Sequence, residues 1–97
     1  MNESIIMRLA KYHGRHYAIT HTGISTDEAI VDLAEHLRTT ERNVIQTLTR
    51  IEDAEAAMDL AKAWAAGDPQ SNALYIHADK MFTRAGVNMW KWLDVKV

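Results

Sequence analysis

Apolar residues recur along most of this chain at intervals of three and four, the spacing that predicts amphipathic helices. The pattern predicts a first helix over residues 3–13, ended by Gly14. Ser25 and Glu28 then have the spacing of a capping box, in which the serine hydroxyl accepts a hydrogen bond from the glutamate backbone N–H. A second helix is therefore expected to begin directly after Ser25.

The longest periodic stretch follows the pair Thr39-Thr40, which can end the second helix and cap the next. It runs for about seven turns before Gly67, and so predicts one long central helix. The expected apolar face of this helix consists of Val44, Leu48, Ile51, Ala54, Met58, Ala61 and Trp64.

The sharpest break in the pattern lies at residues 67–70. Gly67 suits the left-handed conformation at a helix end, and Pro69 cannot continue a helix. Ser71 is the expected N-cap of the helix that follows. That helix should carry Leu74, Ala78, Met81, Phe82 and Ala85, and stop at Gly86.

Two segments are less regular. Residues 16–22 are rich in β-prone side chains and predict a short strand or an extended connector. The tail from residue 87 to residue 97 alternates like a strand, although Trp90, Leu93 and Val97 also suit a helix.

The size of the chain fits one small domain. Its 97 residues are 47% hydrophobic and 25% charged, an ordinary globular balance. We therefore predict a mainly α fold over residues 1–97, with about four helices, one of them a long central helix. No cysteine is present for disulfides or thiolate zinc sites, and no run approaches the roughly 20 apolar residues of a membrane span. These properties favour a soluble cytoplasmic protein without metal or cofactor.

Charge changes the picture of candidate partners. The 13 acidic side chains outnumber the 11 basic ones, which disfavours binding to nucleic acid by electrostatic attraction alone. Most of the acidic residues lie between residues 25 and 66, so the long helix should present an acidic outer face.

A helix-turn-helix is nevertheless an alternative for residues 33–48, whose apolar spacing resembles that of a packed helix, a short turn and a recognition helix. The side chains that could read bases are Arg42, Asn43, Gln46 and Arg50. Arg38 occupies the turn position where glycine is common, and the helix continues into acidic residues that would repel phosphates. A plain helical hairpin fits these features better, with DNA binding as the alternative.

The sequence indicates no enzyme. His13, His16 and His21 are spaced so that they do not share one helix face, which favours surface or half-buried histidines over a metal site. No nucleophile signature and no glycine-rich phosphate loop occurs in the chain.

The tail carries the candidate partner-binding residues, because two indoles within three positions cannot share one face of a helix or strand closely. At least one should be poorly buried, and exposed tryptophan is a common anchor in protein interfaces. The predicted partner-binding face consists of Met89, Trp90, Lys91, Trp92 and Lys96. The equally open alternative is that both tryptophans close the base of the core.

Asp68-Pro69 is a candidate conformational switch. An X-Pro bond populates the cis isomer far more readily than other peptide bonds, and a host prolyl isomerase could control its exchange. The simpler interpretation is an ordinary trans proline after a helix stop.

Three segments carry a resemblance to a known family: the opening residues 1–7 (MNESIIM), the break Gly67-Asp68-Pro69, and the run Trp90-Lys91-Trp92-Leu93. The chain resembles the small anti-RecBCD accessory proteins of lambdoid temperate phages. This resemblance implies a protein of the host cytoplasm that binds the RecBCD helicase-nuclease through its RecC subunit. It further implies altered processing of DNA ends and Chi sites, with DNA reached only indirectly through RecBCD, and it brings no catalytic residues.

Overall fold

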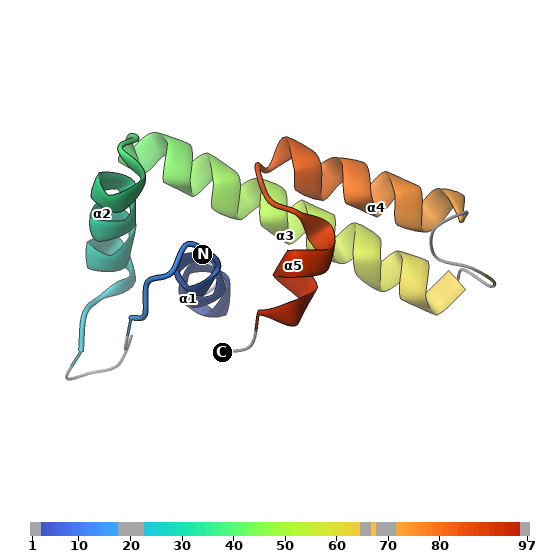
Figure 1. Cartoon of the computed structure of the whole chain (residues 1–97), viewed down its shortest axis with the longest axis horizontal. Helices are drawn as coiled ribbons and strands as arrows, with labels where there is room; N and C mark the ends of the chain where they lie inside the picture. The colour runs from blue at the N-terminus through green and yellow to red at the C-terminus, as the bar shows by residue number, and fades with distance from the viewer. Residues whose placement is uncertain (1–2, 18–22, 65–66, 68–71, 96–97) are drawn as a thin grey trace.

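The computed structural model describes residues 3–17, 23–64, 67 and 72–95, with side chains from residue 5 onward. Within these ranges the chain is all-helical (Figure 1). The helices are α1 (Glu3–Tyr12), α2 (Thr26–Leu37), α3 (Glu41–Trp64), α4 (Ala73–Arg84) and α5 (Met89–Asp94). The mainly α fold with one long central helix is therefore confirmed.

The helix boundaries follow local capping chemistry. Ser25 Oγ accepts a hydrogen bond from the Glu28 backbone N–H at 3.1 Å, as expected for the start of α2. Thr40 Oγ1 accepts from the Asn43 N–H at 3.1 Å at the start of α3. Between them Arg38 adopts a left-handed conformation with φ of 55° and ends α2, so an arginine occupies a backbone position that usually takes glycine.

The expected Ser71 cap for the fourth helix is wrong. Asn72 is the N-cap of α4, and its Oδ1 accepts a hydrogen bond from the Leu74 N–H at 2.9 Å. Asparagine and serine are comparable N-caps, so the composition of this segment does not distinguish between neighbouring candidates.

The strand predicted near residues 16–22 is not found in its described part, while residues 18–22 lie outside the described ranges. Tyr17 is buried in an irregular segment, and its phenol donates a hydrogen bond to the carboxylate of Asp32 on α2. Arg15 Nη2 donates to the same carboxylate oxygen at 2.9 Å. Side-chain contacts with α2 thus fix the start of this connector.

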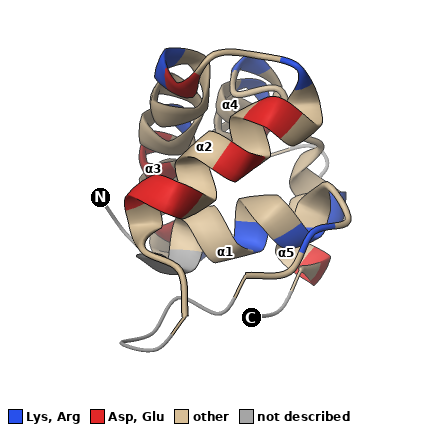
Figure 2. Cartoon of the chain, turned by 90° about the vertical axis from the view of Figure 1, so that its left-hand side faces the viewer, with Lys and Arg blue, Asp and Glu red and all other residues tan. Residues whose placement is uncertain are grey.

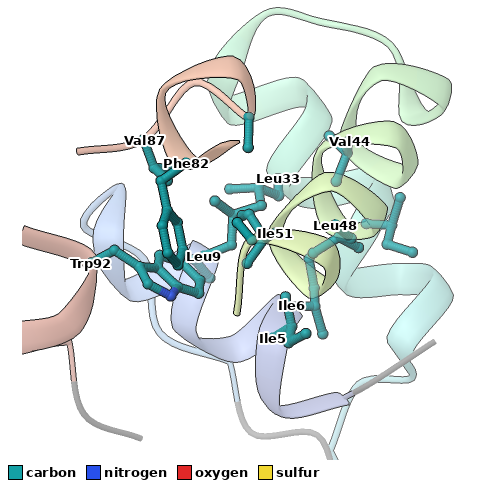
Figure 3. Close-up of a cluster of buried hydrophobic side chains, with 14 of the residues drawn as sticks. Ile5, Ile6, Leu9, Leu33, Val44, Leu48, Ile51, Phe82, Val87 and Trp92 are labelled. Atoms are coloured by element: carbon teal, nitrogen blue, oxygen red, sulfur yellow. The ribbon is translucent and has the colours of Figure 1, made fainter. Parts of the chain in front are cut away.

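Helices α3 and α4 form a hairpin, α1 and α2 cross α3 and pack against it, and α5 contacts α4 (Figure 1). Figure 3 shows side chains from all these parts meeting in one hydrophobic cluster. Its largest fully buried members are Trp92, Phe82, Ile6, Leu9, Leu33, Leu48 and Ile51. Alanines occupy part of the hairpin contact, where Ala54, Ala61 and Ala78 are fully buried. Small side chains at a helix contact permit a short distance between the helix axes.

The tail forms a helix rather than a strand. Asn88 caps α5 through its Oδ1, which accepts a hydrogen bond from the Lys91 N–H at 3.0 Å.

Among the described residues, no helix combines the length and apolar character needed to cross a bilayer.

Replacing Phe82 with alanine tests this core. Phe82 is completely buried, so Phe82→Ala should lower the free energy of unfolding by about 3–5 kcal/mol through lost burial and cavity formation. The neighbouring exposed substitution Thr83→Ala is the control and should change it by less than about 0.5 kcal/mol. Urea unfolding followed by circular dichroism measures both values, and equal stability of the two variants would contradict the packing described.

Candidate protein-interaction surface

Helix α5 is fixed to α1 where it begins. The Asn88 backbone N–H donates a hydrogen bond to the Tyr12 hydroxyl at 3.0 Å. The ammonium of Lys91 lies 4.4 Å from the centroid of the same tyrosine ring, within the range of a cation–π contact. The Tyr12 side chain thus contacts α5 through both its ring and its hydroxyl.

Trp92 fixes the same helix to α3. Its indole is completely buried, and Nε1 donates a hydrogen bond to Glu55 Oε1 at 2.9 Å. Arg8 of α1 donates to the same carboxylate oxygen, and its guanidinium carbon lies 4.5 Å from the centroid of a Trp92 ring. We call Arg8, Glu55 and Trp92 the Trp92 triad. It joins α1, α3 and α5 and satisfies the one polar atom of the buried indole.

The structure separates the residues predicted to face a partner. Met89 and Trp92 are 2% and 0% exposed and belong to the core, so a partner that binds the folded chain cannot contact their side chains. Trp90 is 49% exposed and Lys91 is also on the surface. The expectation that one of the two indoles is poorly buried is confirmed. Lys96 lies outside the described residues, as do Asp68 and Pro69 of the predicted switch.

The sequence pattern places a further tryptophan, Trp64, on the apolar face of α3. Trp64 is 77% exposed and therefore does not belong to the core, which corrects that expectation. A helix has about 3.6 residues per turn, so Trp64 lies about 140° around the axis from the buried Ile51. The sequence does indicate this exposure. Its apolar residues repeatedly advance by three positions, and each such step is short of a full helical turn, so the later ones rotate away from the core. Leu60, one turn earlier, is 50% exposed and was not singled out by the sequence pattern.

The residues of the DNA-binding alternative all lie on the surface of the first half of α3. They are Arg42, Asn43, Gln46 and Arg50. Asn43 is already engaged, because its Nδ2 donates a hydrogen bond to Thr39 Oγ1 at 2.9 Å. In a helix-turn-helix the helix before the recognition helix crosses the DNA backbone. Here that helix is α2, whose exposed side carries acidic residues (Figure 2). Its charge would repel phosphates there.

Asp32, Tyr17 and Arg15 form a polar contact between α2 and the segment that follows α1. The carboxylate of Asp32 accepts hydrogen bonds from Tyr17 and Arg15, which lower its pKa below the ordinary value. Burial is the main cause of the raised pKa of the Tyr17 hydroxyl. These groups connect the segment after α1 to α2.

No group of three or more potential metal ligands gathers among the residues with described positions.

A hollow with a volume of about 210 Å³ lies where the end of α1, the α2–α3 turn and the α4–α5 turn meet. Among its described lining residues, His13 is the one titratable side chain. An acid–base pair for catalysis needs a second such group within hydrogen-bond reach, so this lining does not assemble one.

Comparison of the chain with protein-family models, with curated proteins and with solved structures finds no match. We therefore infer the function from the residues and their exposure. The features that stand out on this surface are the indoles of Trp90 and Trp64.

The Trp92 triad predicts a sharp difference between two glutamates of α3. Glu55→Ala should lower the free energy of unfolding by about 1–3 kcal/mol, because it leaves the buried indole N–H without its acceptor. Glu52→Ala removes an exposed carboxylate from the same helix and should change it by less than about 0.5 kcal/mol. Urea unfolding followed by tryptophan fluorescence compares them. Equal effects would show that the triad does not stabilise α5.

His13 predicts a pH dependence of stability. Burial, then the charges of Lys91 and His36, lower the pKa of His13 below its usual 6.5, so the unfolded chain binds a proton at this site more readily. The free energy of unfolding should therefore fall as the pH drops below about 6.5. The Asp32 carboxyl loses its contribution only below about pH 4, in a separate range.

The control is His13→Gln, which cannot take up a proton. Urea unfolding at several values between about pH 5 and pH 7.5 should show a steeper decline for the original chain than for the variant. Parallel curves would rule out His13 as the source of the dependence.

Proposed function

We propose that this protein binds the host RecBCD helicase-nuclease through its RecC subunit and modifies how that enzyme processes DNA ends and responds to Chi. The identity of the partner comes from the resemblance of residues 1–7, Gly67-Asp68-Pro69 and Trp90-Lys91-Trp92-Leu93 to the anti-RecBCD accessory proteins. The proposal places the protein in the host cytoplasm, where it would act on DNA only through RecBCD.

The observation that supports a binding role is the half-exposed Trp90 on α5. This helix is held by the buried Trp92 and by the contacts of Asn88 and Lys91 with Tyr12. A tryptophan on a helix that is already ordered loses little conformational freedom when a partner covers it. Lys91 beside it adds a positive charge at the edge of the same surface.

The size of the chain is sufficient for such a role. A standard protein interface buries about 800 Å² on each partner, and a few central residues supply most of its binding energy. Tryptophan is enriched among these residues. We therefore propose Trp90 as an energetic centre of the contact with RecC and Lys91 as part of its rim.

The test uses purified RecBCD and the tagged full chain. The chain should bind RecBCD and alter its degradation of linear duplex DNA and its Chi-dependent products. Trp90→Ala should weaken binding by at least about 2 kcal/mol if Trp90 is a hot spot. The control is Ile76→Ala, since Ile76 on α4 is 41% exposed and apolar but carries no predicted role. Circular dichroism checks that both variants are folded.

Two results would contradict the proposal. One is failure of the full chain to bind RecBCD at all. The other is binding to DNA in the absence of RecBCD with a steep salt dependence, which would favour the alternative that uses Arg42, Asn43, Gln46 and Arg50. Wild-type affinity of Trp90→Ala would leave RecBCD as the partner but remove Trp90 from the interface.

A further inference from the structure

The last turns of α3 carry two large apolar side chains on the surface. Leu60 is 50% exposed and Trp64 is 77% exposed. Residues four apart on a helix are neighbours on one face, so these two side chains form one apolar patch. Tryptophan is a large side chain that is highly buried on average, which makes its exposure here unusual.

No described helix covers this patch. The side of α3 that contacts the core and α4 includes Met58 and Ala61, which are 2% and 0% exposed. Leu60 and Trp64 lie outside that side of the helix. Figure 1 shows that the end of α3 and the start of α4 extend beyond α1, α2 and α5. A partner could therefore approach the patch without displacing any of these three helices.

The charges beside the patch indicate what kind of partner fits. Asp53 stands seven positions before Leu60, close to two helical turns, and so lies on the same face. Asp53 is exposed, as are Glu52 and Asp59 nearby on the same helix. The carboxylate of Asp53 on this face repels the phosphates of nucleic acids and anionic lipid headgroups, and it attracts lysine and arginine side chains.

We infer that the outer face of α3 from Asp53 to Trp64 is a docking helix that lies in an apolar groove of a protein partner whose rim is basic. The groove holds Leu60 and Trp64 in apolar pockets, and a lysine or arginine of its rim faces Asp53. This is the helix-in-groove mode of recognition, in which one face of an amphipathic helix supplies the anchors. The inference rests on the proposed function, so the partner that supplies the groove is RecBCD.

A second copy of this chain fits the face less well. A two-fold dimer through this surface would place the same patch of both copies in contact. Asp53 lies on the same face as Leu60 and Trp64, so the interface would take in the Asp53 carboxylates of both copies, and like charges across an interface are unfavourable. A basic rim on a different protein removes this repulsion.

The experiment measures the affinity of purified RecBCD for the full chain and for four variants at low and moderate salt. Leu60→Ala and Trp64→Ala remove the anchors, and Trp64→Ala should weaken binding by about 30-fold or more. Asp53→Lys reverses the charge and should weaken binding more strongly at low salt than at moderate salt. Ile76→Ala is the matched control and should bind within about two-fold of the original chain.

The outcomes separate this inference from the proposed function. If the original chain does not bind RecBCD, the proposed function fails and the docking helix fails with it. If the original chain binds and both Leu60→Ala and Trp64→Ala bind equally well, the docking helix alone is wrong. Tighter binding of Asp53→Lys would contradict the basic rim. Circular dichroism of each variant shows that a loss of affinity does not come from unfolding.

Discussion

The burial of the Trp92 indole is the interaction on which the arrangement of the C-terminal part depends. Helix α5 has six residues, too few to be stable as an isolated helix in water. Its position comes from Trp92, whose ring enters the core and whose Nε1 finds its acceptor on Glu55 of α3. Without that acceptor the burial of the indole would leave a polar atom unsatisfied. One carboxylate therefore permits the largest side chain of the core to be completely enclosed.

The same constraint determines what remains on the surface. With Trp92 and Met89 inside, helix geometry turns Trp90 outward. Helix α3 has 24 residues and packs against the core with one side. The spacing of its apolar residues rotates gradually around the helix axis, so that Trp64 lies away from the core. The three tryptophans thus occupy a fully buried, a half-exposed and a mostly exposed site. Their environments follow from backbone geometry rather than from differences in residue type.

The correct predictions from the sequence came from local signals at the helix ends. Ser25 with Glu28, Thr40 before α3, and the glycine after α1 each act within a few residues, so they predicted helix ends directly. Local signals could not decide whether the tail forms a helix or a strand, because α5 depends on contacts with Tyr12 and Glu55, which are distant in the chain. For the same reason the sequence could not say which of the two neighbouring indoles is buried. The exposure of Trp64 required following the helical phase over several turns.

Helix α3 continues without a break from the turn after α2 to Trp64, a length of roughly 36 Å. A single uninterrupted helix spans the part packed against α1 and α2 and the end of the hairpin. A partner that gripped the hairpin end would hold the remainder of the domain in a defined orientation, without a flexible linker between them. Any second contact, such as one through α5, would then form at high effective concentration, and the complex would dissociate slowly even if each contact were weak.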